Sequence, residues 1–254
     1  MAERVDSLDR HYQSIEKTKS ISNYLFGINV FLSIILLLIN EMEFVKYITT
    51  IFFIVTTLLY FIVDNYLSVF LIPSVEEKRR THLLTDSLGI PLDAEYTNLY
   101  YNNNLQPSIL RLGANILENS LFSLRVTSEM VKKEGILILL YTVIWLGCMV
   151  LRNTDLALIS VISQTLFATT LIPSFVRLVV LRNQNKRVHD ELYRVFLLRK
   201  TTTQKSIVPL VIDAFVKYES AKAYSGIKQS SRIFFRINDE VTQEWAVIKN
   251  KLGI

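Results

Sequence analysis

The sequence predicts an all-α integral membrane protein with four transmembrane helices, arranged as two hairpins with a helical cytoplasmic part. Half of the 254 residues are apolar and only 20% are charged, whereas a soluble domain carries roughly 25% charged residues. The apolar residues gather in four blocks that are almost free of charge. Lysine and arginine are concentrated outside the blocks, and no run of residues shows the two-residue alternation of a strand.

The four blocks have the lengths and the composition of membrane spans. They cover residues 24–40, 47–72, 136–151 and 156–181. A spanning helix needs roughly 20 residues, with about 17 as the lower limit, so the first and third blocks need flanking residues at the interface. Each block is apolar nearly all round, whereas a helix on the surface of a soluble core has one polar face. In lipid every backbone group has to bond inside its own segment, so we expect helices.

Counts of lysine and arginine predict the orientation. The segment 1–23 holds four, the segment 75–135 holds seven and the segment from Arg177 holds fifteen, whereas the loops 41–46 and 152–155 hold one each. Because cytoplasmic loops carry the excess of Lys and Arg, both termini and the central segment are expected inside the cell. The sequence thus divides into an N-terminal cytoplasmic helix, a first transmembrane hairpin, a central cytoplasmic segment, a second hairpin and a basic C-terminal domain. These parts span residues 1–23, 24–73, 74–135, 136–181 and 182–254.

The cytoplasmic segments also show helical periodicity. A helix is expected from Pro107, with Ser123 or Thr127 restarting it before the third block. Residues 178–199 follow alternating three- and four-residue steps through Asn185. This spacing is typical of a coiled-coil seam between copies, and equally of an amphipathic helix that packs on its own chain. Two further helices are expected, at 206–226 with Pro209 in the first turn, and at 231–252.

Polar side chains inside the blocks are candidates for a pore or gate. Thr50, Thr57 and Asp64 recur every seven residues on the second block. The fourth block carries Ser163, Gln164 and Thr170. An ionisable group at membrane depth is costly and faces a cavity or the bundle interior, and a ring of acids favours cations. The alternative is hydrogen bonding between helices, which Ser, Thr and Gln commonly supply.

Positive charge gathers in the last part of the chain. The segment from Arg177 has fifteen basic and seven acidic residues, a net charge of +8. Such a surface suits a phosphate-rich ligand, although basic residues beside a membrane also bind anionic headgroups. Tyr193, Tyr218, Tyr224 and Phe235 add aromatic faces that nucleic-acid bases can stack on, although aromatic residues at helical spacing more often form core. The candidate ligand-binding residues are Lys186, Arg187, Arg194, Arg199, Lys200, Arg232 and Arg236.

Enzymatic chemistry is not expected. The sequence has no Gly-rich phosphate loop and no G-x-S-x-G or H-E-x-x-H motif. Its single cysteine and three scattered histidines lack the spacing of metal ligands. We therefore predict no catalytic residue, no metal and no cofactor.

The segment from Asn98 to Phe122 resembles a motif of small four-span membrane effectors of bacterial anti-phage systems, of the CBASS-like or Hailong type. The residues that carry this resemblance are Tyr100, Tyr101, Asn102, Asn103, Arg111, Asn115, Glu118 and Asn119. The resemblance, which covers roughly residues 20–180, implies an oligomeric ion channel in the bacterial inner membrane, most simply a tetramer. It also implies a partner nucleotidyltransferase whose nucleotide or oligonucleotide product controls the channel. In Hailong-type systems a short DNA oligomer holds the channel shut, and in CBASS-like systems a cyclic nucleotide opens it.

Two other functions are compatible with the sequence. A non-conducting, membrane-anchored module that recruits a soluble partner would use the large helical cytoplasmic part. A small transporter is suggested by a weak repeat, in which Leu71 to Ser74 recurs as Leu171 to Ser174. Transporters of this kind use broken helices, and the glycines in the apolar blocks are too sparse to suggest them, so the transporter ranks third.

Overall fold

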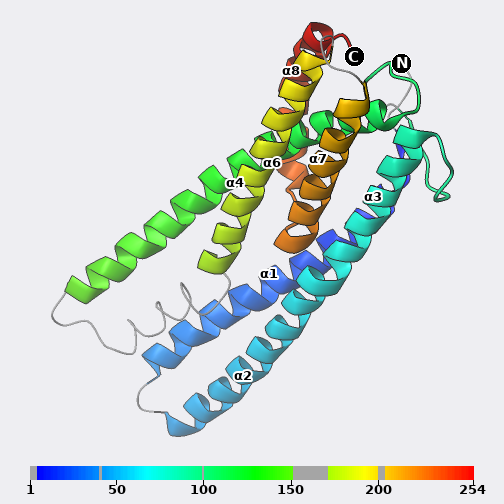
Figure 1. Cartoon of the computed structure of the whole chain (residues 1–254). Helices are drawn as coiled ribbons and strands as arrows, with labels where there is room; N and C mark the ends of the chain where they lie inside the picture. The colour runs from blue at the N-terminus through cyan, green and yellow to red at the C-terminus, as the bar shows by residue number, and fades with distance from the viewer. Residues whose placement is uncertain (1–4, 40–41, 99, 151–170, 200–203) are drawn as a thin grey trace. The chain divides into compact units, whose positions relative to one another are not determined.

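A computed structural model describes residues 5–39, 42–98, 100–150, 171–199 and 204–254 (Figure 1). The chain forms two compact units. The first, which we call the hairpin unit, comprises residues 11–72 and 134–175, and the second, the bundle unit, comprises residues 1–10, 73–133 and 176–254. The borders lie within a few residues of those expected at 73, 135 and 181. The N-terminal segment expected as 1–23 is divided after Arg10, and the termini join the central segment in one unit.

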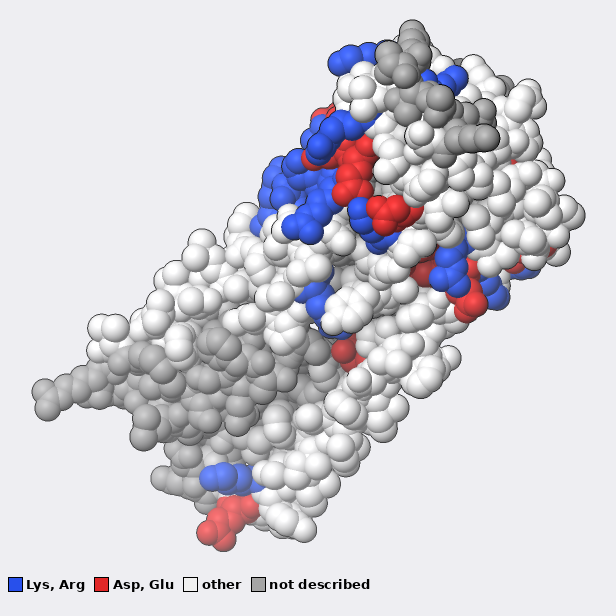
Figure 2. Space-filling model, in the orientation of Figure 1, with Lys and Arg blue, Asp and Glu red and all other residues white. Residues whose placement is uncertain are grey.

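The hairpin unit contains two long apolar helices, α1 (Asp9–Leu38) and α2 (Glu43–Asn65). None of the residues of α2 is buried, and its large side chains are exposed, as at Phe44, Phe52 and Phe61. Figure 2 shows a long stretch of surface without charged atoms. In the described ranges, the segments Asp9–Leu36 and Glu43–Leu88 are long and apolar enough to cross a membrane.

Helix α2 does not end where its apolar block ends. It continues through a π-helical turn, η1 (Tyr66–Leu71), into α3 (Ile72–Leu88), which ends at Gly89 with a positive φ of 68°. A π-helical turn inserts an extra residue into a helix without breaking it. The second apolar block and the first part of the bundle unit are therefore one uninterrupted helix.

Helix α4 (Ile109–Val150) also passes from the bundle unit into the hairpin unit. The expected restart at Ser123 or Thr127 is wrong, because neither hydroxyl caps a helix. Thr127 Oγ1 donates to the Ser123 carbonyl one turn earlier, and Ser123 Oγ bonds to the Tyr218 hydroxyl. Both are satisfied inside an unbroken helix.

Helix α6 (Leu171–Leu198) packs its seven-residue seam inside its own chain. Leu178, Leu181, Asn185, Val188 and Leu192 are all at most 1% exposed. The seam then shifts to Phe196, which is buried, while Val195 is half-buried. Of the two interpretations of this spacing, the structure supports packing on the own chain, since a seam between copies would be exposed in a single chain.

The last two helices complete the bundle core. They are α7 (Gln204–Ser225) and α8 (Ser231–Leu252). Helix α7 begins before Ser206, so Pro209 lies inside it and not in the first turn as expected. Gly226 has a φ of 57°, in agreement with its predicted place after a helix end, and the Ser230 hydroxyl accepts from the Ile233 amide as the N-cap of α8.

The bundle core contains side chains from all five helices of this unit. Trp245 and Val241 of α8 meet Leu83 of α3, Leu117 of α4 and Val211 of α7 in one apolar cluster. A two-residue ribbon, which the sequence did not predict, pairs β1 (Val5–Asp6) with β2 (Thr97–Asn98) in antiparallel register. It fixes the start of the chain to the loop that follows α3.

Candidate functional site

The asparagines of the central motif belong to a polar network that fixes the loop before α4, in which Asn115 and Glu118 are buried and Asn102 is exposed. The Asn102 backbone amide and side-chain amide donate to the two oxygens of Glu118, at 3.1 and 3.0 Å. The Asn102 carbonyl accepts from the Trp245 indole of α8 at 3.3 Å. Glu118 is 3% exposed, so its carboxylate is held by donors in place of water.

A second branch of the network joins the loop to α3. Asn103 donates its side-chain amide to Asn115 Oδ1 at 2.6 Å, and Asn115 in turn donates to Asp86 and Ser87 at 3.0 and 2.9 Å. Arg111 Nη2 contacts both carboxylate oxygens of Asp86, at 2.9 and 3.1 Å. The motif therefore connects α3 and α4, which both belong to helices that continue across the border between the units.

The motif tyrosines lie beside the network. The Tyr100 and Tyr101 rings meet edge to face with centroids 4.8 Å apart, and the Arg79 guanidinium lies 4.8 Å from the Tyr100 centroid. Burial raises the pKa of Tyr101 well above its usual value, and the nearby Asn119 side chain acts in the opposite direction. All eight motif residues are thus brought together, and their contacts anchor a loop.

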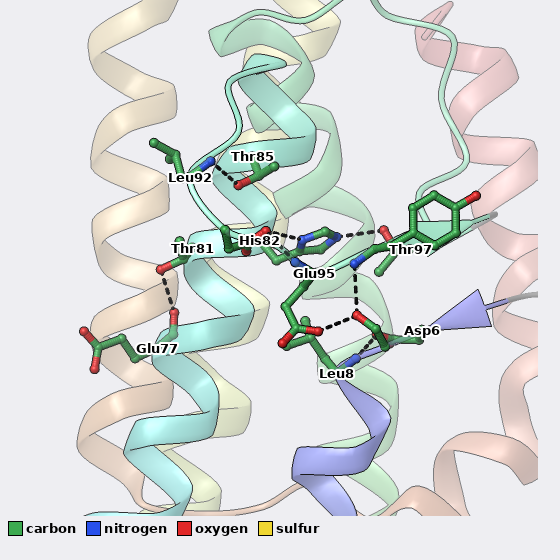
Figure 3. Close-up of polar contacts among 12 residues, drawn as sticks. Asp6, Leu8, Glu77, Thr81, His82, Thr85, Leu92, Glu95 and Thr97 are labelled. Atoms are coloured by element: carbon green, nitrogen blue, oxygen red, sulfur yellow. Dashed lines mark hydrogen bonds and ion pairs between the residues drawn. The ribbon is translucent and has the colours of Figure 1, made fainter.

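Figure 3 shows a second polar cluster, which sequence reasoning missed. His82 of α3 lies between Asp93, 3.2 Å from Nδ1, and the Thr97 hydroxyl, 2.9 Å from Nε2 (Figure 3). Since a carboxylate only accepts, Nδ1 donates to Asp93. Asp6 of β1 pairs with Arg79 at 2.8 Å, and both side chains are at most 9% exposed. The residues are 11 to 73 positions apart, so no local spacing could have indicated them.

A buried charge cluster joins α3 to α7. Lys222 Nζ lies 2.6 Å from Glu76 and 3.6 Å from Glu219, and all three side chains are at most 14% exposed. Burial raises the pKa of Glu219. Burial also raises the pKa of Tyr218, to about 12, and this ring lies in the core and offers no stacking face to a ligand. Two carboxylates that share one ammonium group favour the neutral form of one of them.

The candidate ligand-binding residues do not form a single site. Arg187 and Arg194 are exposed two turns apart on one face of α6, and neither has an ion pair among the described residues. Lys186 pairs with Asp190 on the same helix. Arg199 is half-buried directly after α6, and Lys200 lies outside the described residues.

The other two candidates belong to the opposite end of the bundle unit. Arg236 pairs with Glu129 of α4 at 3.0 Å, and Arg232 is exposed one turn earlier. Their neighbour Ile233 packs against Leu178, near the start of the bundle part of α6. Because 16 residues of α-helix rise about 24 Å, Arg194 lies far from this contact.

The polar residues expected to line a pore are bonded within the hairpin unit. Ser22 of α1 donates to Asp64 at 3.3 Å, and Asn29 of α1 accepts from Thr56 and, at 3.4 Å, from Thr57. Thr50 is half-buried, and its hydroxyl donates to the Lys46 carbonyl of the same helix at 2.8 Å. Thr57 and Asp64 therefore line the contact between α1 and α2. Ser163, Gln164 and Thr170 lie outside the described residues.

Positive charge is distributed unevenly over the surface. Figure 2 shows Lys and Arg atoms gathered in one region, with acidic atoms beside them. The described residues contain no group of three or more His, Cys, Asp or Glu side chains that could hold a metal ion. Comparison of the chain with models of protein families, with curated proteins and with solved structures finds no match.

Proposed function

We propose that this chain is the subunit of an oligomeric membrane channel, controlled by a nucleotide or oligonucleotide that binds to its bundle unit. The observation that carries the proposal is helix continuity between the two units. The α2–η1–α3 helix, α4 and α6 each pass from one unit into the other without interruption. A ligand that shifts α6 in the bundle unit would move the apolar end of the same helix, since a helix transmits displacement along its axis.

The exposed arginines indicate the class of ligand. Arg187 and Arg194 lie on one face of α6, seven residues and about 10 Å apart. Arginine binds phosphate oxygens through a fixed fork of donors. Two exposed arginines along a helix favour an extended ligand with several phosphates over a compact one.

The proposed biological role comes from the resemblance of the central motif to anti-phage effectors. A partner nucleotidyltransferase would make the ligand, and opening of the channel would depolarise the infected cell. We propose four spans, a location in the bacterial inner membrane, both termini in the cytoplasm, and a ring of four copies. The network around Asn115 supports this role by holding α3 and α4 together, so that two helices leading into the hairpin unit move as one body beside α6.

Planar-bilayer recording of the purified chain tests the proposal. We expect a conductance that nucleotides or short oligonucleotides change, that Asp64→Ala alters, and whose ligand response Arg187→Glu/Arg194→Glu abolishes. The charge-retaining Arg187→Lys/Arg194→Lys variant is the matched control and should keep most of the response. Absence of any conductance, with and without nucleotides, would rule the channel out.

A non-conducting, membrane-anchored binding module is the second candidate. It is favoured by the hydrogen bonds of Asp64 to Ser22 and of Thr56 to Asn29, which use the polar groups of α2 inside the hairpin. Replacement of Thr50 and Thr57 by Leu discriminates the two functions. Full biological activity of this variant in cells would support the module, and loss of conductance together with activity would support the channel.

A further inference from the structure

The turn between α7 and α8 lies at the end of the bundle unit from which the apolar helices depart. Ile233, in the first turn of α8, packs with Met130 of α4 and Leu178 of α6, and Ile227 of the turn packs against the same cluster. Met130 is three residues from the point at which α4 enters the hairpin unit, and Leu178 is two residues beyond the point at which α6 leaves it. Residues 224–236, which we call the α7–α8 turn, are therefore next to both crossings, although they lie more than 40 residues from either apolar block in sequence.

This turn exposes aromatic side chains that a water-facing surface would not favour. Tyr224 is 86% exposed and Phe235 is 70% exposed. Phe234, next to it, is instead turned inward, with its ring 5.7 Å from that of Phe122. The chain thus packs one phenylalanine of the pair, which is half-buried, and exposes the other.

Positive charge accompanies the exposed aromatic rings. Arg232 and Lys133 are exposed and have no ion pair among the described residues. Lys133 is the last residue of α4 inside the bundle unit. Nearby, Glu129 is already engaged by Arg236 and Lys132, at 3.0 and 2.6 Å, and its pKa is lowered by Lys132 and, to a smaller extent, by Arg236. The unpaired charge of this end is therefore positive.

We infer that the α7–α8 turn is an interfacial anchor that binds anionic lipid headgroups at the cytoplasmic surface of the membrane. The inference rests on the membrane insertion proposed above. A tyrosine ring, with its polar hydroxyl edge, favours the headgroup level of a bilayer, and an exposed phenylalanine favours the apolar layer directly below it. Each exposed Lys or Arg near an anionic leaflet is attracted to its negative surface potential. A soluble acidic partner would satisfy the charge alone, whereas a bilayer satisfies the charge, the exposed rings and the position beside two membrane-directed helices together.

The anchor also assigns Arg232 a role different from that of Arg194. Arg194 lies on α6 about 24 Å farther from the crossings, counted from Leu178. Charge reversal at the two positions should therefore separate lipid binding from ligand binding.

An environment-sensitive fluorophore on a cysteine at position 235 tests the anchor in the full-length chain. The substitution Cys148→Ser removes the single native cysteine, and Phe235→Cys or Val247→Cys introduces the labelling site. Val247 is the matched control, because it is 68% exposed on the same helix and 12 residues, about 18 Å, farther along. The protein is placed in vesicles of phosphatidylcholine alone or with one third phosphatidylglycerol.

We expect the fluorophore at position 235 to shift to the blue in the anionic vesicles and to be quenched at least twofold more by headgroup-nitroxide lipid than the one at position 247. Arg232→Glu/Lys133→Glu should remove this difference. Equal quenching at both positions would overturn the inference. So would a blue shift that follows the protein-to-lipid ratio and not the lipid charge, since that result indicates a second copy as the occupant.

Extraction of the same vesicles at alkaline pH keeps the two proposals apart. If the chain stays in the vesicles and position 235 is not quenched, only the anchor is wrong. If the chain is released, the proposed membrane insertion is wrong as well.

Discussion

Asn115 and Asn185 are both 0% exposed inside the bundle unit, yet their surroundings differ completely. Asn115 accepts from Asn103 and donates to Asp86 and Ser87. The two polar side-chain atoms of Asn185 have no hydrogen-bond partner among the described residues. A buried amide with partners stabilises the fold, whereas an amide without them costs its desolvation.

Asn115→Leu should therefore destabilise the protein strongly. It removes the Asn115 contacts of Ser87 and Asn103, whereas Asp86 loses one donor and keeps Arg111. Each buried group left unsatisfied costs about 1–3 kcal/mol. The measurement is thermal unfolding in detergent, followed by circular dichroism. Ser120→Ala is the matched control, because Ser120 is equally buried in α4 and its hydroxyl only donates to the Leu117 carbonyl. An effect of Asn115→Leu no larger than that of the control would show that the network is not what stabilises the loop.

Asn185→Leu should have the opposite effect and stabilise the protein. The substitution keeps the branching and the number of side-chain heavy atoms, and it replaces an unpartnered amide by an apolar side chain in an apolar seam between Leu181 and Val188. We expect stabilisation by about 1–2 kcal/mol in the same unfolding experiment. A decrease in the melting temperature would show that the larger methyl groups of leucine overpack the seam by more than removal of the amide gains.

The seam that contains Asn185 shows which features of the fold could be predicted from the sequence. The seven-residue seam of α6 and the helix at 231–252 were predicted because helical spacing of apolar residues is a local signal. The spacing of the seam could not distinguish packing against another copy from packing within the same chain, because either arrangement buries the same face of α6. The structure answers this with Leu192, which lies in the core with residues of α4 and α7.

Features set by distant contacts were not predictable. The central motif was singled out by resemblance, but its role in pinning a loop depends on Asp86 and Trp245, which lie outside it. The continuity of α4 was missed because Ser123 and Thr127 look like caps in sequence and are satisfied within the helix in the structure. Arg232 was grouped with Arg194 by composition alone, and only packing separates them.

The stability of the bundle unit should fall as the pH falls below neutral because of His189. Burial is the main cause that lowers the pKa of His189. The nearby Asp190 and Glu244 carboxylates raise this pKa, and the Lys186 and Arg125 charges lower it further. The unfolded chain, with an ordinary histidine pKa of about 6.5, takes up a proton before the folded one. The stabilisation is therefore complete above pH 6.5 and is lost as the pH falls through this value towards the lower folded pKa.

The free energy of unfolding, measured by urea titration in detergent at pH 7.5 and pH 5.5, checks this dependence. His189→Gln should flatten the difference between the two pH values, because glutamine does not titrate. An unchanged pH dependence in this variant would assign the effect to other groups.

Gly113 brings α4 closest to α7, and its substitution should reveal how tightly the two helices pack. A Cβ at this position would lie 3.0 and 3.2 Å from the two methyl groups of Val211 and 3.4 Å from Phe196. Val211 is 0% exposed and β-branched, so it has no free rotamer into which it can move. Alanine gains about 1 kcal/mol over glycine in a helix, but overpacking a core costs about 1–3 kcal/mol. We expect Gly113→Ala to lower the melting temperature by a few degrees.

Gly27→Ala is the control, since nothing lies within 4 Å of the Cβ that it would add, and it should leave stability unchanged or raise it. If both variants were stabilised alike, α4 and α7 would not be in the close contact that the core requires.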